Sequence, residues 1–180
     1  MPISIRLAKT KKDVYGFMDV QATTWAETYQ NPKRGLTKEM ILSHFEKRNT
    51  EEKILKRFES LKDPTNKHWI AIDNEKVIVW FGCFKDFEKQ SGSGAIYVLP
   101  EYQGKGIGRK MLKKGFKWLS DMKYIEIGVL EYNAMAIEWY MRLGFEFTGE
   151  KEDLAIGDFI GKNWILKMRK ELHNEDDAFG

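Results

Sequence analysis

The chain has 180 residues, 42% of them hydrophobic and 13% aromatic, which indicates one folded domain with a real core and excludes global disorder. Its formal net charge is only +3, too small to indicate a nucleic-acid-binding protein by itself. The single cysteine, Cys83, excludes an internal disulfide framework and a zinc site built from cysteines.

The first part of the chain predicts one strand followed by three helices. Residues 3–8 alternate apolar and polar side chains, as a half-buried strand does. Residues 14–25 carry apolar side chains at helical spacing, and residues 37–48 and 50–62 are predicted to form two further helices. These helices precede the main run of strands.

The sequence period then changes to that of β-strands. Residues 68–72 and 77–87 are rich in Val, Ile, Trp and Phe and flank a short polar turn, which predicts an antiparallel hairpin. A second turn is expected over 91–93 and a further strand over 95–99. The elements expected after Pro100 are a helix over 107–119, a strand over 124–130, a helix over 133–143, and strands over 145–149 and 164–168.

This order of elements predicts a mixed α/β or α+β domain built around one sheet. One domain is expected over residues 1–172, followed by a polar tail over 173–180 that we expect to be flexible. The N-terminus has no signal-peptide core, no apolar run approaches the ~20 residues of a membrane span, and the histidines lack metal-ligand spacing. We therefore expect a soluble, cytoplasmic protein with no metal ion and with neither a membrane nor a nucleic acid as partner.

A loop with glycines at alternate positions, Gly104, Gly106 and Gly108, lies between a predicted strand and a predicted helix. Because these positions carry no side chains, a phosphate group can approach the backbone N–H groups closely. The start of the helix adds unpaired N–H donors and about half a positive charge. Lys105 and Arg109 add full charges, so the loop is expected to bind a pyrophosphate.

Two other phosphate-binding loops can be compared with this one. A Walker loop is excluded because Gly-Lys-Ser/Thr is absent. A dinucleotide fingerprint counted from Gly104 needs its third glycine at position 109, which is arginine. Glu131, at the end of the next strand, could imitate the ribose-binding acid. A NAD(P) enzyme therefore stays a rival reading, although an antiparallel hairpin before the loop does not suit a parallel βαβ unit.

Two segments resemble motifs of one enzyme family. Gln103-x-x-Gly106-x-Gly108, which follows Tyr97-Val98-Leu99-Pro100, resembles the signature of the GNAT superfamily of N-acetyltransferases. Residues 133–145, Asn-Ala-Met-Ala-Ile-Glu-Trp-Tyr-Met-Arg-Leu-Gly-Phe, resemble the second cofactor segment of that family. The resemblance implies a central, mostly antiparallel twisted sheet of six to seven strands flanked by about four helices. It also implies a single acyl-CoA N-acyltransferase domain that uses acetyl-CoA.

The resemblance also implies how the cofactor is held. In the family the loop amides bind the pyrophosphate of coenzyme A, and the strand before the loop splays from the next strand to admit the cofactor. The backbone N–H of Val98 would polarise the acyl carbonyl. Asn133 would bind the pantetheine arm or a site water, or cap its helix. The loop residues implied are Gln103, Gly104, Lys105, Gly106, Ile107, Gly108 and Arg109.

Tyr140 would be the general acid that protonates the leaving thiolate. A phenol has a reference pKa of ~10 and an alkyl thiol ~8.5, so the transfer is slightly uphill but feasible at short range. The alternative for this residue is a core aromatic packed beside Trp139. A general base is harder to assign, because the strand over 95–99 carries no carboxylate where a glutamate often sits. Glu131, Glu27 and Asp86 are alternatives, none of them compelling.

The acceptor is expected to be a small-molecule or peptide amine. Residues 24–29, expected to follow the first helix, resemble the acceptor-side segment of a branch that includes polyamine N-acetyltransferases. Trp25 and Tyr29 would wall the acceptor pocket and Glu27 would attract a cation, although Trp25 also fits the core. Many relatives pair as homodimers. A non-catalytic acyl-CoA-binding module is the remaining alternative.

Overall fold

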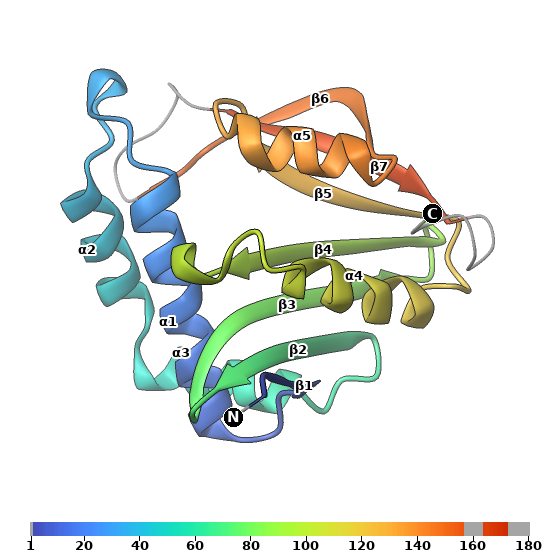
Figure 1. Cartoon of the computed structure of the whole chain (residues 1–180), viewed down its shortest axis with the longest axis horizontal. Coiled ribbons are helices and arrows are strands. Elements are labelled where there is room, and N and C mark those ends of the chain that lie inside the picture. The colour runs from blue at the N-terminus through green and yellow to red at the C-terminus, as the bar shows by residue number, and fades with distance from the viewer. Residues whose placement is uncertain (1, 157–163, 173–180) are drawn as a thin grey trace.

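A computed structural model of the chain describes residues 2–156 and 164–172. Its helices and strands follow one another in the order that the sequence predicts (Figure 1). The strands are β1 (Ser4–Leu7), β2 (Asn66–Asp73), β3 (Lys76–Asp86), β4 (Ser91–Val98), β5 (Tyr124–Leu130), β6 (Glu146–Asp153) and β7 (Trp164–Glu171). The helices are α1 (Lys11–Thr28), α2 (Lys38–Arg48), α3 (Glu51–Ser60), α4 (Ile107–Trp118) and α5 (Ala134–Arg142), with short 3₁₀ turns at Pro32–Arg34 and Pro100–Tyr102.

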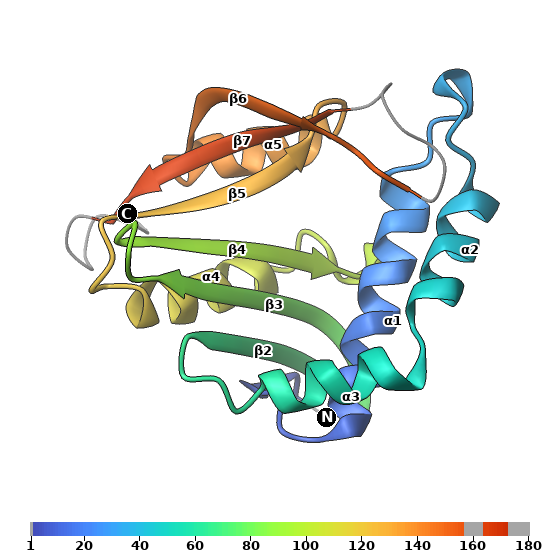
Figure 2. The ribbon, with the colours of Figure 1, turned by 180° about the vertical axis from the view of Figure 1, so that it is seen from behind.

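The strands form one mixed sheet of seven, in the order β1-β2-β3-β4-β5-β7-β6. Every neighbouring pair is antiparallel except β4 and β5, which are parallel. Helices α1, α2 and α3 lie on one face of the sheet, and α4 and α5 lie on the other (Figures 1 and 2). The predicted fold class is therefore confirmed, with five α-helices in the described ranges where about four were expected.

The predicted turn over 91–93 is wrong. Strand β4 begins at Ser91, which pairs with Asp86, and the turn lies just before it, with Gln90 at a φ of 53°. The glycines in this run serve close packing instead. A Cβ at Gly92 would lie 2.7 Å from the Cδ1 atom of Leu119. Glycine inside a strand can mark such a close approach as well as a turn.

Two other expectations need comment. Helix α1 continues to Thr28, so residues 24–29 belong largely to its last turns and do not follow it. The flexible tail expected over 173–180 lies outside the described residues.

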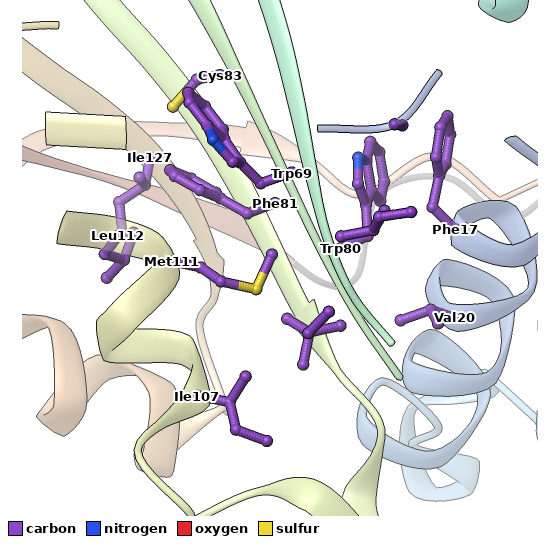
Figure 3. Close-up of a cluster of buried hydrophobic side chains, with 14 of the residues drawn as sticks. Phe17, Val20, Trp69, Trp80, Phe81, Cys83, Ile107, Met111, Leu112 and Ile127 are labelled. Carbon is purple, nitrogen blue, oxygen red and sulfur yellow. The ribbon is translucent and has the colours of Figure 1, made fainter. Parts of the chain in front are cut away.

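The core has two layers, one on each face of the sheet. Successive side chains of β3 point to opposite faces, so Trp80 faces α1, where its ring stacks on Phe17 with centroids 4.8 Å apart. Phe81 faces α4, where it lies near Met111 of that helix (Figure 3). Helix α4 lies very close to the sheet here, because a Cβ at Gly115 would come within 2.3 Å of the Phe81 ring.

Strands β4 and β5 part halfway along their length. They pair only where residues 91–94 meet residues 124–127, and beyond that point they diverge (Figure 1). The Leu99 N–H donates to the Ile78 carbonyl at 3.1 Å, so Val98 occupies a non-hydrogen-bonded position of the β3–β4 ladder. Its N–H therefore points away from β3, toward the side of β5. The splay implied by the family resemblance is confirmed.

Asp13 secures the start of α1. Its carboxylate accepts two hydrogen bonds from the Arg6 guanidinium, at 2.9 and 2.7 Å, and others from the backbone N–H groups of Lys9 and Thr10. Burial alone would raise the pKa of this carboxyl, but these hydrogen bonds outweigh it and lower the pKa to about 2. The folded protein therefore holds the charged form more strongly than the unfolded chain does.

Replacing Asp13 by Asn is expected to lower the free energy of unfolding at pH 7 by about 2 kcal/mol. The pKa in the folded state is depressed, so the stabilisation is complete above the unfolded value of about 4 and is lost as the pH falls toward 2. Urea denaturation followed by tryptophan fluorescence should show the gap between wild type and variant closing below pH 4. A gap that stays constant from pH 7 to pH 2.5 would contradict this account.

Candidate functional site

The glycine loop between β4 and α4 leaves its backbone uncovered. Gly104 and Gly106 both have a φ of 73°, a left-handed conformation that favours glycine. A Cβ at either position would meet no described atom within 4 Å. Gly106 is the N-cap of α4 without a side-chain cap, and the Lys110 N–H is the first to bond within the helix, to the Gly106 carbonyl. The amides of the first turn are thus available to an anion.

Side chains around the loop hold its shape. The Gln103 amide donates to the Val98 carbonyl at 3.1 Å, which ties the loop to the end of β4. The Tyr102 hydroxyl donates to Asp73 at 2.8 Å, and the Lys105 ammonium lies 4.8 Å from the Tyr102 ring centroid. The contact between Tyr102 and Asp73 was not predicted, because nothing in the sequence indicates that the β2–β3 turn reaches this loop.

The remaining loop residues differ in what they expose. Ile107 is 5% exposed and packs into the core, so its backbone N–H is the part that faces the loop. Arg109 is exposed in the first turn of α4. A Cβ at Gly108 would lie 3.5 Å from the Trp139 ring, so the start of α4 lies against α5. The loop and the second predicted cofactor segment are therefore neighbours in space.

Helix α5 carries Asn133 at its N-cap and Tyr140 near its end. The Asn133 side chain accepts from the Ala136 N–H at 3.2 Å, so its capping role is present. Tyr140 is 6% exposed, and its ring lies against Trp139 and Phe145 with centroids 5.1 and 5.3 Å away. This position fits both predictions for Tyr140, namely a residue of the acetyl-transfer site and a core aromatic residue.

Three tyrosines from separate elements meet on this part of the sheet. Burial raises the pKa of Tyr140, and the neighbouring Tyr97 hydroxyl raises it further. Burial likewise raises the pKa of Tyr29, and both other phenols add to the effect. All three hydroxyls therefore keep their protons at neutral pH. Tyr97 lies within the segment that resembles the family motif, but the sequence predicts no role for it.

The three residues expected on the acceptor side do not all lie together. Trp25 and Tyr29 are four residues apart on α1, and their ring centroids are 4.7 Å from one another. The indole N–H of Trp25 is buried and has no hydrogen-bond acceptor among the described residues. Glu27 points elsewhere, because it is exposed and forms an ion pair with Lys38.

The carboxylates considered as a general base all have other partners. Glu131 forms an ion pair with Arg34 and accepts from the Trp164 N–H at 3.3 Å. Asp86 accepts from the Lys89 N–H at 3.1 Å in the turn before β4. Together with the ion pair of Glu27, these contacts give each candidate a structural role at the surface.

The described ranges, residues 2–156 and 164–172, show neither a metal-binding cluster nor a membrane-spanning helix. These ranges hold no group of three or more His, Cys, Asp or Glu side chains placed to bind a metal ion. None of the helices within them is both long and apolar enough to cross a membrane.

The family of the chain follows from comparison with known proteins. Residues 33–145 match the family model described as the acetyltransferase (GNAT) family. This match covers more than half of the chain, and the chain therefore belongs to the GNAT acetyltransferase family.

Individual relatives agree with this assignment. The chain is 33% identical over 95 residues to spermine/spermidine N(1)-acetyltransferase of Bacillus subtilis, covering 48% of this chain and 59% of that protein. It is 27% identical over 122 residues to the L-amino acid N-acyltransferase MnaT of Escherichia coli, covering 62% and 69%. The match thus spans less than two thirds of the length of the Bacillus relative.

The fold is shared with solved structures across nearly the whole chain. The PaiA N-acetyltransferase of Thermoplasma acidophilum, crystallised in complex with coenzyme A, aligns with a TM-score of 0.73 over 95% of this chain and 99% of that one. A phosphinothricin acetyltransferase of Sinorhizobium meliloti, in complex with AcCoA, aligns with a TM-score of 0.68 over 95% and 89%. At 21% and 17% identity, these likenesses establish the fold alone.

Proposed function

We propose that this chain is an acetyl-CoA-dependent N-acetyltransferase that acts on an amine by direct attack in a ternary complex. The observation that carries the proposal is the Val98 N–H, which points away from β3 toward the parting of β4 and β5, at the end of the strand that leads into the uncovered loop amides. The relatives support an amine acceptor, since their names describe acetylation of spermine and acylation of amino acids.

The loop residues would bind the pyrophosphate of coenzyme A. The amides from Gly104 to Arg109 provide the donors, and the charges of Lys105 and Arg109 add long-range attraction. Gln103 would act through its bond to β4, which holds the loop in place. The pantetheine arm would then run between β4 and β5 past Asn133. Bound acetyl-CoA would supply the acetyl group as a thioester.

The reacting groups can be assigned from the same geometry. The Val98 N–H would donate to the thioester oxygen as negative charge develops there during attack by the amine. The amine attacks in its neutral form, the new C–N bond forms, the C–S bond breaks, and the Tyr140 hydroxyl would give its proton to the sulfur. The proton that the nitrogen loses on becoming an amide would pass to water, from which the Tyr140 phenolate regains its own. The raised pKa of Tyr140 keeps that proton available, and the same dry surroundings would raise the pKa of the thiol it meets.

Acetyl-CoA is expected to raise the melting temperature of the protein by roughly 5–10 °C at about 100 times its Kd. NAD and NADPH at the same concentration are expected to leave it unchanged. A parallel assay of free thiol release should give turnover with at least one member of a panel of polyamines, amino acids, aminoglycosides and peptides.

Each alternative has its own outcome in these experiments. Stabilisation by NAD(P) and not by acetyl-CoA would reject the proposed function outright. Stabilisation by acetyl-CoA without thiol release from any amine would instead favour a non-catalytic acyl-CoA-binding module.

A further inference from the structure

The turn between β2 and β3 lies against the segment that leads into the glycine loop. The Tyr102 hydroxyl donates to the Asp73 carboxylate at 2.8 Å, and the Lys76 ammonium lies 3.6 Å from a carboxylate oxygen of Glu101. Asp73 is the last residue of β2, and Tyr102 ends the short 3₁₀ turn before the loop. Two residues 29 positions apart in the chain thus meet immediately before Gln103, where the proposed pyrophosphate loop begins.

The β2–β3 hairpin presents Asp73 at a well-defined position. Its strands are joined by two residues, Asn74 and Glu75, which both have a positive φ, of 45° and 68°. Tight turns of this kind follow the twist of the strands and hold the flanking pair, here Asp73 and Lys76, in register. The Asp73 carboxylate is therefore carried by a short, ordered hairpin end.

A β-bulge lies next to this turn. The β2–β3 register shifts between Ala71 and Ile72, which leaves Ile78 as an extra residue in β3. A bulge bends its strand, and β3 curves at this end (Figure 1). The Ile78 carbonyl accepts from the Leu99 N–H at 3.1 Å, so the bend lies beside the end of β4. Backbone and side-chain contacts thus both join the hairpin end to the segment that leads into the loop.

Tyr102 also contacts the loop itself through its ring. The Lys105 ammonium lies 4.8 Å from the ring centroid, within the range of a cation–π contact. Lys105 is one of the two cations proposed to attract the pyrophosphate. Gln103, the next residue after Tyr102, donates to the Val98 carbonyl at 3.1 Å. Tyr102 therefore connects the Asp73 carboxylate to a charged side chain of the loop.

The hydrogen bond between Tyr102 and Asp73 is the strongest contact between the turn and the loop segment. Its acceptor is a carboxylate and its surroundings are partly buried, and both conditions strengthen a hydrogen bond. It also raises the pKa of Tyr102, so the hydroxyl keeps its proton at neutral pH. The side chains of Lys76 and Glu101 are instead 63% and 56% exposed, and exposed ion pairs contribute little.

We propose that Asp73 and Tyr102 are positioning residues for acetyl-CoA, and that their hydrogen bond holds the glycine loop in the arrangement that binds the pyrophosphate. Without this bond the loop is expected to adopt other conformations as well. The ligand then has to order the loop on binding, which weakens its affinity. The Kd for the cofactor therefore depends on the β2–β3 turn, while the transfer step does not. This inference rests on the proposed acetyl-CoA-dependent function.

Two substitutions remove the bond from its two sides. Tyr102→Phe deletes the hydroxyl and keeps the ring beside Lys105, and Asp73→Ala deletes the acceptor. Each is expected to raise the Kd for acetyl-CoA, measured by isothermal titration calorimetry, by about 5- to 30-fold. The double variant should bind no more weakly than the weaker single variant, because both changes remove the same bond. The KM for acetyl-CoA should rise in parallel, while kcat at saturating acetyl-CoA stays within about twofold.

The direction of the effect separates positioning from charge. Asp73→Ala removes a negative charge near a proposed anion site, so electrostatics alone would strengthen binding. Glu75→Ala is the matched control, because it removes the same charge from the same turn. Glu75 pairs only with Lys12 at the surface, where the two side chains are 85% and 79% exposed, so its Kd should stay within about twofold of wild type. Asp73→Asn keeps an acceptor for the hydroxyl and should recover most of the affinity.

A general loss of stability is also distinguishable from positioning. It would lower the melting temperature of the variants without changing the Kd of the folded protein. The calorimetric titrations are therefore made at a temperature at which thermal denaturation shows every variant to be folded. An unchanged Kd in Tyr102→Phe and Asp73→Ala would overturn the positioning role while the acetyltransferase stands. An equal loss of affinity in Glu75→Ala would also overturn it, since the turn as a whole and not this bond would then control affinity.

Failure of the proposed function has a different signature. If wild type binds acetyl-CoA but acetylates no amine, the Kd values still decide the positioning role, because they need no acceptor. If wild type binds neither acetyl-CoA nor coenzyme A, the proposed function is rejected and the positioning role with it.

Discussion

The Gly106→Asp variant is expected to lose measurable binding of acetyl-CoA, with the Kd rising roughly 1,000-fold. The new carboxylate would stand at the N-cap of α4, where the pyrophosphate is proposed to lie. Two like charges about 4 Å apart at a partly solvated site repel by about 4 kcal/mol, which corresponds to that factor. Isothermal titration calorimetry with acetyl-CoA and with coenzyme A measures the change directly.

Gly149→Asp provides the matched control for this experiment. Gly149 lies in β6 with a φ of 85°, and a Cβ there would meet no described atom within 4 Å, as at Gly106. The substitution therefore adds the same charge at a comparable backbone conformation, away from the loop. It should leave the Kd unchanged. Equal affinity of Gly106→Asp and wild type would show that the loop does not hold the pyrophosphate.

Tyr140→Phe is expected to lower kcat by about 100- to 10,000-fold while the Kd for acetyl-CoA stays within about twofold. The substitution removes the hydroxyl and leaves the ring, whose packing against Trp139 and Phe145 should hold the fold. Single-turnover measurements of acetyl transfer separate this chemical step from product release.

Tyr124→Phe is the control, because it also removes one tyrosine hydroxyl. Tyr124 lies at the end of β5 that is still paired with β4, away from the point where the two strands part, so this variant should turn over as wild type does. Full activity of Tyr140→Phe would make Tyr140 a core aromatic, the alternative that the sequence had left open. A loss of cofactor affinity in parallel with kcat would point to a binding role and away from proton transfer.

Local sequence patterns predicted the elements well and failed where a pattern has two causes. Apolar side chains at helical spacing located α1 and α4, because those faces pack against the sheet. The run over 91–93 predicts a turn, although Gly92 and the following Gly94 allow close contacts with Leu119 and Phe81. The predicted first helix ends too early, at Trp25, where its stripe of apolar side chains stops. The helix continues to Thr28, because no glycine or proline interrupts the chain before that residue.

The candidate site divides in the same way. Its loop and Tyr140 lie in contiguous motifs, so they were accessible from the sequence. The contact of the Tyr102 hydroxyl with Asp73 was not, because it depends on how the end of β2 lies against the loop. The sequence also did not predict that Glu27 points away from Trp25 and Tyr29. Its position depends on which side of the last turn of α1 it occupies and on its ion pair with Lys38. Contacts between residues that are far apart in the sequence leave no periodic pattern in it.

The close contact between α4 and the sheet at Gly115 limits which substitutions the proposed acetyltransferase could accept. Gly115 is nine residues from Gly106, about 13 Å along the helix, yet its contact with Phe81 sets how far the loop stands from Val98. In the proposed function this spacing has to suit acetyl-CoA, because the pantetheine arm limits how far the thioester can lie from the pyrophosphate. A bulkier residue at position 115 would push α4 away from Phe81 and so change the distance between the loop and Val98. A genetic screen would then record a defect in acetyl transfer at a position that is buried in the core and distant from the proposed ligand.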